Sequence, residues 1–398
     1  MKIGVPRETA EGERRVAITP QSVTQLVGEG NEVLVQASAG EASSILDADY
    51  AAAGATVVSD AQTLYAQAEM VLRVGRPSDE EVGQLRPNTV LIGTLGTLSN
   101  PELARRLAEQ GVTAISMDAI PRITRAQSMD SLSSQSTVGG YKAVILAAER
   151  LPKFFPLLTT AAGTVRPARG IIMGAGVAGL MAIGTARRLG AVVEATDVRP
   201  VVKEQVQSLG GTFLEVEMTD EEKANAQTEG GYAREMGPDY QRRQAELIAA
   251  HIRDADFIIT TALIPGRPAP RLVTEEMVKS MKPGSVIIDM AAEAGGNCEL
   301  TEPGREVVRH GVRIVGITNL PATMPGSATQ MYSRNVQTLV QHLVKDGKLE
   351  LRFDDEITRG ATITHGGQVI HAATAKALGI EPAAVLAAAT ASTPEGGS

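Results

Sequence analysis

Three glycines stand where a phosphate-bearing ligand could approach the backbone. Gly174, Gly176 and Gly179 form a G-x-G-x-x-G pattern directly after an apolar run at residues 170–173. In such a pattern the first glycine permits a tight turn, the second lets the backbone approach a pyrophosphate, and the third lets the next helix pack on the sheet. Asp197 ends the following apolar run, where a carboxylate can accept hydrogen bonds from ribose hydroxyls. This order of features predicts a dinucleotide site.

The acid also indicates which dinucleotide is bound. A 2′-phosphate about 4 Å from Asp197 would cost ~1–4 kcal/mol per charge pair, depending on screening, so NAD(H) is favoured over NADP(H). Arg199 is close in sequence and could reduce that penalty. Residues at the end of a later apolar run would reach the same edge of a parallel sheet. We therefore predict a site that also includes Ala175, Val177, Val198, Arg199, Thr261, Ala262 and Leu263.

Short apolar runs alternate with helical stretches along the chain, which is typical of parallel sheets flanked by helices. Six strand-like runs precede residue 120 and six follow residue 169, so we expect an α/β fold with two Rossmann-like, doubly wound parallel-sheet domains. The runs lie at residues 3–5, 33–36, 56–58, 70–74, 90–95 and 114–117, and then at 170–173, 191–196, 212–216, 255–261, 286–290 and 312–317.

Two long helical patterns set the expected domain boundaries. Apolar positions at helical spacing predict a helix at residues 134–155 that crosses from the first sheet to the second. A second pattern at residues 328–345 would return the chain to the first domain. We therefore expect a discontinuous first domain, residues 1–133 plus 322–398. The second domain, 134–321, would contain the linking helix and the dinucleotide site.

A polar segment of 24 residues, 217–240, interrupts the second domain. Loops of that length without structure of their own are uncommon in compact domains and are often lids or binding loops. A solvated excursion explains the polarity equally well, so both interpretations stay open at this point.

Composition argues against several functional classes. A net charge of −8 disfavours nucleic acid as the main partner. Cys298 is the lone cysteine, and the five histidines form no ligand cluster, so we expect no metal site. The N-terminal residues turn polar by position 7, and no run of 18 apolar residues occurs. We therefore expect a cytoplasmic protein without a signal peptide that does not itself insert into a membrane.

Several motifs together resemble one family over nearly the whole chain. They are Ile3-Gly4-Val5-Pro6-Arg7-Glu8 with Gly12-Glu13-Arg14-Arg15-Val16-Ala17 and Thr19-Pro20, the glycine motif, Ile288-Asp289-Met290-Ala291, Gly295-Gly296-Asn297 and Ile317-Thr318-Asn319-Leu320-Pro321. In their order they look like the family that alanine dehydrogenases share with the NAD(H)-binding alpha subunits of proton-translocating transhydrogenases.

Two positions separate the branches of that family. An alanine dehydrogenase has a Lys in a V-K-E-P-like stretch and a His after a T/Y-L pair, but this chain has Gly75 and Gly96 there. Arg15 remains, although one arginine cannot supply the proton transfers that reductive amination needs. The resemblance therefore implies the transhydrogenase branch. An alanine dehydrogenase-like amino-acid oxidoreductase is the alternative, and a non-catalytic NAD-binding module is a further one.

The transhydrogenase branch implies roles for two loops. Residues 121–135 look like the loop that surrounds the nicotinamide in transhydrogenases, which places catalytic roles on Arg122, Gln127, Asp130 and Ser133. Arg122 and Asp130 would form an ordered pair, and Ser133 would bind the carboxamide. Residues 230–236 resemble the tip of a mobile loop that closes over NAD(H), which adds Gly231, Tyr232 and Met236 to the cofactor site.

The same resemblance implies partners and a location. NAD(H) would bind to this chain and NADP(H) to a partner subunit, and membrane-spanning subunits would couple hydride transfer to proton translocation. The chain would form a homodimer and associate peripherally with the inner (cytoplasmic) membrane through those partners.

Overall fold

Two parallel sheets organise the chain, one in each of two units. The computed structural model describes residues 1–226, 233–234, 236–264 and 266–383. Unit 1 is Met1–Ser134 with Pro325–Ser398, and unit 2 is Gln135–Met324. The boundaries proposed from the sequence fall after residues 133 and 321, whereas the units divide after 134 and 324. None of the described helices is both long and apolar enough to cross a membrane.

The sheet of unit 1 has a parallel core with an antiparallel edge. The order β3-β2-β1-β4-β5-β6 is that of a doubly wound nucleotide-binding fold. Strand β18 pairs antiparallel with β6, and β19 pairs antiparallel with β18. The strands are β1 (Lys2–Val5), β2 (Glu32–Gln36), β3 (Thr56–Val58), β4 (Met70–Leu72), β5 (Val90–Gly93), β6 (Thr113–Ser116), β18 (Thr362–His365) and β19 (Gln368–Val369).

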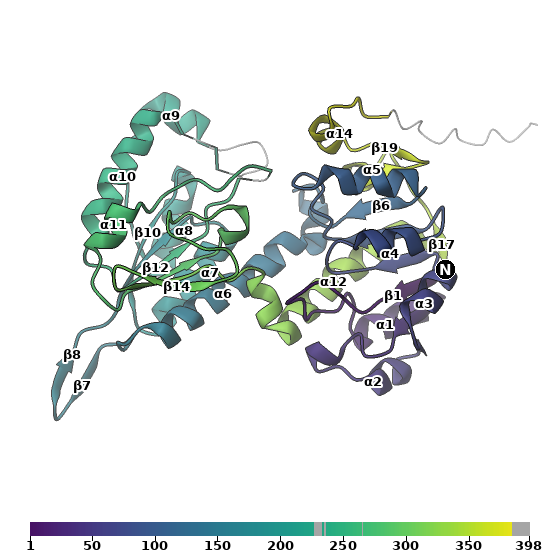
Figure 1. Ribbon diagram of the computed structural model, residues 1–398, viewed down its shortest axis with the longest axis horizontal. Coiled ribbons are helices and arrows are strands. Elements are labelled where there is room, and N and C mark those ends of the chain that lie inside the picture. The colour runs from purple at the N-terminus through teal and green to yellow at the C-terminus, as the bar shows by residue number, and fades with distance from the viewer. Residues whose placement is uncertain (227–232, 235, 265, 384–398) are drawn as a thin grey trace, which may run out of the picture. The chain divides into compact units, whose positions relative to one another are not determined.

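Helices cover both faces of this sheet, so its strands are apolar on both sides (Figure 1). The returning helix α12 (Pro325–Leu343) buries a stripe that includes Tyr332, Val336 and Leu339 in one of the two cores. The other helices of this unit are α1 (Pro20–Gly28), α2 (Asp47–Ala52), α3 (Ala61–Gln67), α4 (Asp79–Gln84), α5 (Pro101–Glu109), α13 (Glu356–Ala361) and α14 (Ala372–Leu378), with 3-10 turns η1 (Glu41–Ser43) and η2 (Thr124–Met129). Strands β16 (Val344–Lys345) and β17 (Lys348–Leu349) form a separate short hairpin.

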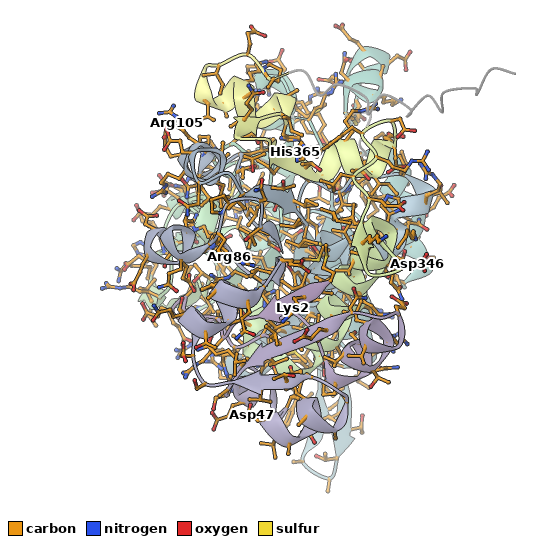
Figure 2. All side chains as sticks on the ribbon, turned by 90° about the vertical axis from the view of Figure 1, so that its right-hand side faces the viewer. Lys2, Asp47, Arg86, Arg105, Asp346 and His365 are labelled. Carbon is orange, nitrogen blue, oxygen red and sulfur yellow. The ribbon has the colours of Figure 1, made fainter. Side chains whose placement is uncertain are left out.

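The charged side chains of unit 1 are spread over many elements. Figure 2 faces this unit and labels residues that come from separate helices, strands and turns, from Lys2 on β1 to His365 on β18.

The sheet of unit 2 repeats the same strand order. Its order is β11-β10-β9-β12-β13-β15-β14, parallel except for β14. The strands are β9 (Arg169–Met173), β10 (Val192–Thr196), β11 (Thr212–Phe213), β12 (Phe257–Thr260), β13 (Val286–Asp289), β14 (Glu306–Arg309) and β15 (Val312–Val315). A hairpin of β7 (Leu158–Thr160) and β8 (Gly163–Val165) extends from the unit (Figure 1). The predicted fold class, two Rossmann-like doubly wound sheets, is confirmed.

Two of the helices of unit 2 begin at threonine side-chain caps, Thr219 and Thr274. The helices of this unit are α6 (Ser131–Arg150), which carries the chain over from unit 1, α7 (Val177–Arg188), α8 (Lys203–Ser208), α9 (Asp220–Asn225), α10 (Pro238–Ile252) and α11 (Glu275–Ser280), with 3-10 turns η3 (Pro200–Val202), η4 (Ala292–Ala294) and η5 (Leu320–Thr323). The helix predicted at residues 134–155 starts earlier and stops at Arg150, because Pro152 disfavours a helical residue before it.

The polar segment 217–240 has more regular structure than its composition suggests. Thr219 accepts a hydrogen bond from the Glu222 backbone N–H, while the Glu222 carboxylate accepts one from the Thr219 N–H, so a capping box starts α9. Helix α10 then begins at Pro238, inside the predicted loop. The T-x-x-E pattern at residues 219–222 is the sequence signal for the start of α9.

Helix α6 packs against the start of α7 through a glycine. A Cβ atom at Gly140 would overlap the backbone carbonyl of Ala178, while one at Gly139 would meet the methyl end of Met290, 2.9 Å away, and the Pro321 ring at an ordinary 3.9 Å. The backbones of α6 and α7 are therefore in direct contact at Gly140.

We predict that Gly140→Ala destabilises the protein while Gly139→Ala does not. Alanine in a helix interior gains about 1 kcal/mol over glycine in both variants. At position 140 the methyl group must displace backbone atoms, and overpacking of this kind costs about 1–3 kcal/mol, whereas the tip of a methionine can move aside at position 139. Urea unfolding followed by circular dichroism measures both midpoints. Equal midpoints in the two variants would contradict the close backbone contact.

Candidate functional site

The glycine turn of unit 2 joins β9 to α7. Gly174 has φ +95°, a conformation that favours glycine, and a Cβ there would lie 2.6 Å from the Thr261 hydroxyl. A Cβ at Gly179 would overlap the Gly174 carbonyl oxygen, so α7 starts directly on the turn. Above Gly176 the nearest atom is the Arg199 guanidinium, 3.8 Å from where a Cβ would be. The turn thus leaves open space beside the backbone of Gly176.

The N-terminus of α7 faces that open space. Gly176 is the N-cap residue, and no side chain caps the first turn, so its backbone N–H groups can bind an anion such as a phosphate. Val177, the first helical residue, is 40% exposed. This arrangement suits a pyrophosphate, for which close backbone approach and N–H donors are both needed.

Asp197 lies directly after β10 and binds the glycine turn. Its carboxylate Oδ2 accepts a 2.7 Å hydrogen bond from the Ala175 N–H. Its Oδ1 accepts from the Arg199 N–H at 2.8 Å, and the Arg199 guanidinium donates to both oxygens at 2.8–2.9 Å. This bond raises the pKa of Arg199. Asp197 and Arg199, predicted as neighbours in the site, are therefore a bidentate ion pair.

The end of β12 completes this edge of the sheet. The Thr261 hydroxyl donates to the Gly174 carbonyl at 3.0 Å. The buried Asn297 amide accepts from the Ala262 N–H at 3.0 Å and donates to the Ala262 and Pro270 carbonyls at 2.9 and 2.8 Å. Leu263 is 47% exposed. Thr261, Ala262 and Leu263 were predicted here, and Asn297, which holds them, was given no role.

A second residue without a predicted role organises β13. Asp289 is 1% exposed, and its two oxygens accept from the Thr260 and Thr301 hydroxyls at 3.0 and 2.6 Å and from the Ala291 and Cys298 N–H groups at 3.0 and 2.9 Å. A buried carboxylate needs such partners. Asp289 therefore connects the end of β12 with the backbone that follows β13.

The described ends of the segment 217–240 pack beside Asp197. Val216, Ala226, Met236 and Tyr240 form a small apolar cluster, and Val198 contacts it. Burial, and after it the charge of Asp197, raises the pKa of Tyr240 to about 12. Met236 is buried next to the predicted site, while Gly231 and Tyr232, also predicted there, lie outside the described residues.

The predicted nicotinamide loop lies in unit 1. Arg122 and Gln127 are exposed, and Gln127 lies on η2. The structure brings Asp130 and Ser133 together at the start of α6, where the Asp130 carboxylate accepts from the Ser133 N–H at 2.9 Å and from its hydroxyl at 2.6 Å. The Ser133 hydroxyl, which was predicted to bind the carboxamide of the nicotinamide, thus donates to the Asp130 carboxylate at the start of α6.

Gly75 and Gly96 stand where an alanine dehydrogenase has a Lys and a His, and the structure leaves room beside both. A Cβ at Gly75 would meet only Glu8, at 3.8 Å, and one at Gly96 only Ser99, at 3.5 Å. Glu8 already binds the buried Arg73 at 3.1 Å and the Val74 N–H at 2.6 Å.

Arg15 is also engaged within the chain, because its guanidinium contacts the Glu13 carboxylate at 2.6 Å. The Lys and His of an alanine dehydrogenase are thus replaced by glycines, and the carboxylates nearest to them are Glu8 at Gly75 and Asp118, which accepts from the Gly96 N–H at 3.3 Å.

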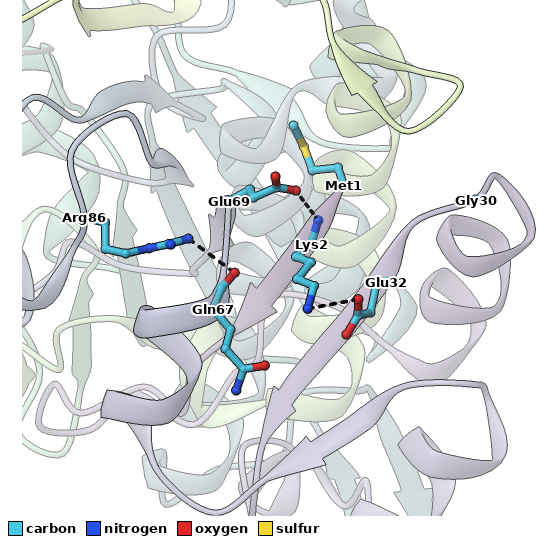
Figure 3. A pocket seen from close by; sticks show the side chains of 7 residues that line it. All are labelled: Met1, Lys2, Gly30, Glu32, Gln67, Glu69 and Arg86. Atoms are coloured by element: carbon cyan, nitrogen blue, oxygen red, sulfur yellow. Dashed lines mark hydrogen bonds and ion pairs between the residues drawn. The ribbon is translucent and has the colours of Figure 1, made fainter.

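A shallow depression lies at the amino ends of β1, β2 and β4 (Figure 3). Its charged groups are already paired: Lys2 contacts Glu32 at 3.3 Å, and Arg86 donates to the Ala68 carbonyl at 2.9 Å. Ligands of doubly wound sheets bind at the carboxyl ends of strands, which is the opposite edge. The depression is therefore no candidate site.

Comparison with known proteins agrees with these features. The family model described as "Alanine dehydrogenase/PNT, N-terminal domain" matches residues 4–139, and "Alanine dehydrogenase/PNT, C-terminal domain" matches residues 143–372. The chain is 50% identical over 380 residues to the first part of NAD(P) transhydrogenase subunit alpha of Rhodospirillum rubrum, which covers 94% of this chain and 98% of that protein. It is 32% identical over 391 residues to alanine dehydrogenase of Bacillus subtilis, which covers 96% of each.

Solved structures give the same result. The transhydrogenase from Sinorhizobium meliloti has a TM-score of 0.84 at 45% identity and covers 93% of this chain and 100% of that one. An L-alanine dehydrogenase has a TM-score of 0.80 at 28% identity and covers 95% and 99%. Both family models, the identities and the fold agree, and the chain therefore belongs to the alanine dehydrogenase/PNT family.

Proposed function

We propose that this chain is the NAD(H)-binding component of a proton-translocating transhydrogenase. It would pass a hydride from NADH to NADP⁺ held by a partner subunit, and membrane-spanning subunits would couple that transfer to proton movement. The observation that carries the proposal is a dinucleotide-type glycine turn in unit 2 combined with glycines at positions 75 and 96. The 50% identity to a transhydrogenase alpha subunit supports the same branch.

The proposed reaction asks for orientation rather than acid–base chemistry. Only a hydride moves between two nicotinamide rings, so the chain needs no side chain that gives or takes a proton. It needs the reacting carbons held close and aligned, which is an entropic and geometric task. We assign this task to the loop with Arg122, Gln127, Asp130 and Ser133. The Asp130–Ser133 hydrogen bonds, at 2.6 and 2.9 Å, support a role in fixing the backbone there.

At the nucleotide end, the open space beside Gly176 and the N–H groups of α7 would hold the pyrophosphate of NAD(H). Asp197 would accept hydrogen bonds from the adenosine ribose. Its four hydrogen bonds already use the acceptor positions that a carboxylate offers. Arg199 would therefore yield at least one of its bonds to Asp197 when a ribose binds. Met236, packed near Val198, would cover the bound nucleotide.

We also propose that the chain forms a homodimer through the β7–β8 hairpin. A two-stranded hairpin is marginally stable alone in water. Near it, Phe154 and Leu157 are 59% and 60% exposed, and Val165 on β8 is 38% exposed. A second copy that covers these side chains would stabilise the hairpin by removing apolar surface from water.

The activity assay tests the proposed function directly. We expect transfer from NADH to an NADP⁺ analogue with a distinct absorbance once the NADP(H)-binding partner subunit is added, and none by this chain alone. With NADH, pyruvate and ammonium we expect no turnover, because positions 75 and 96 lack proton-transfer groups. Steady NADH oxidation with pyruvate would instead identify an amino-acid oxidoreductase.

Substitutions of Asp197 and of Arg199 should change the preference for NADH over NADPH in opposite directions. NADH should bind more tightly than NADPH, and Asp197→Asn should narrow that ratio by about tenfold, since it removes a charge that repels the 2′-phosphate. Arg199→Met should widen the ratio, because it removes the cation that partly neutralises Asp197. Fluorescence titration of each variant with both nucleotides measures the ratios. An unchanged ratio in Asp197→Asn would show that this carboxylate does not select the nucleotide.

The hairpin should control the oligomeric state. We expect the wild-type chain to sediment with twice its mass of 41.7 kDa and Leu157→Asp to sediment as a monomer. Val308→Asp is the matched control, since Val308 is also exposed in unit 2, at 53%, but lies on β14. A monomeric wild type, or a dimer that survives Leu157→Asp, would refute the proposed interface.

A further inference from the structure

The stretch that carries Gln127, Asp130 and Ser133 has little internal support. It consists of the six-residue 3-10 turn η2 followed by the start of α6. 3-10 turns are short and have poorer hydrogen-bond geometry than α-helices. The conformation of this stretch must therefore depend on contacts from elsewhere in unit 1.

Apolar contacts supply some of that support. Ala126 and Met129 are 1% and 5% exposed in the core of unit 1, whereas Gln127 between them is exposed. Burial decides which face of η2 points inward, but apolar contacts are non-directional. They do not by themselves fix the rotation or register of the backbone that presents Gln127.

A buried amide supplies directional support to η2, and at the start of α6 the buried Ser131 hydroxyl also donates to the Met117 carbonyl, at 3.3 Å. Asn335 on α12 is 8% exposed, and its Nδ2 donates to the Ser128 carbonyl at 2.7 Å. Its Oδ1 accepts from the Ser134 hydroxyl at 2.7 Å. The two contacts lie on either side of the Asp130–Ser133 cap. One side chain thus connects the end of η2 with the first turn of α6.

The other polar contact to η2 is weaker. The Arg125 guanidinium contacts the Asp355 carboxylate at 3.1 Å, but the Arg125 side chain is 64% exposed. Exposed ion pairs contribute little, because water screens them and the long side chain loses entropy. Asn335 is therefore the stronger constraint.

We propose that Asn335 is a positioning residue for hydride transfer, a role that rests on the proposed function above. It holds the Ser128 backbone carbonyl and the Ser134 hydroxyl so that Gln127, Asp130 and Ser133 keep one arrangement. Its hydrogen bonds reach Ser128 and Ser134 of unit 1, whereas the glycine turn and Asp197 belong to unit 2, so we expect its effect in the transfer step and not in the binding of NADH.

The test compares two buried positions on α12 that bind different segments of unit 1. Asn335→Asp keeps the shape and the acceptor but replaces the donor that faces the Ser128 carbonyl. Asn335→Ala, a second variant, removes both contacts. The matched control is Ser333→Ala, because buried Ser333 accepts from the Thr19 N–H at 2.9 Å and pairs with the Ser22 hydroxyl at 2.7 Å. It thus ties α12 to the N-terminal segment instead of to η2.

Hydrogen exchange on the full chain gives a readout that needs no activity. Both Asn335 variants should speed exchange in residues 124–134 by about tenfold or more, with little change in residues 19–26. Ser333→Ala should show the reverse pattern. Unchanged exchange in residues 124–134 in both Asn335 variants would overturn the proposal.

Single-turnover transfer with the NADP(H)-binding partner and the NADP⁺ analogue gives the second readout. Asn335→Asp should slow transfer by about ten- to a hundredfold while the NADH dissociation constant stays within about twofold. Gln127→Asn shows how much the transfer rate falls when a residue of this loop is itself changed. Equal rates for Asn335→Asp and Ser333→Ala, or a loss explained by weaker NADH binding, would overturn the inference alone. A wild-type chain that transfers nothing with the partner would overturn the proposed function, and this inference with it.

Discussion

The direct contact of three backbones at the start of α7 is the constraint on which the candidate nucleotide site depends. On one side Gly179 leaves no room for a Cβ against the Gly174 carbonyl, and on the other Gly140 of α6 leaves none against the Ala178 carbonyl. Interiors are packed too densely to absorb an added methyl group there without displacement. The strand β9, the turn and helices α6 and α7 are therefore packed backbone against backbone, and this packing sets the direction of the N–H groups of α7.

At the strand ends, buried carboxylates hold the backbone in place through hydrogen bonds. A carboxylate withdrawn from water must recover its hydrogen bonds from the protein, so each one gathers backbone and side-chain donors around it. Asp197 gathers the turn at Ala175, and Asp289 gathers the loops after β12 and β13. In unit 1, Glu8 binds Arg73 and the backbone after β4. The carboxyl edge of each sheet is thus held by charge, while the faces are held by apolar packing.

Sequence patterns predicted the features that depend on nearby residues. Apolar periodicity indicated both sheets, and the spacing of Gly174 to Asp197 placed the turn correctly because β9, α7 and β10 are consecutive. The capping box at Thr219 was equally local but was hidden in a polar segment, so α9 was missed. Asn297 and Asn335 act across 35 and 207 residues of chain, and an asparagine in isolation gives no sign of its partners. Their roles become visible only when the fold brings donor and acceptor together.

The two units of the fold differ in what their carboxyl edges offer. In unit 2 the edge keeps an open space beside Gly176 and a helix terminus with free capacity for an anion. In unit 1 the corresponding edge carries the ion pair of Glu8 with Arg73, and positions 75 and 96 are glycines. An enzyme that moves protons needs titratable groups near a substrate, whereas one that moves only a hydride gains from their absence, since water and stray acids compete with the acceptor. The glycines at positions 75 and 96 and the hydrogen-bonded loop around η2 then suit the same chemistry: under the proposed function, this chain contributes alignment and leaves bond making to the nucleotides.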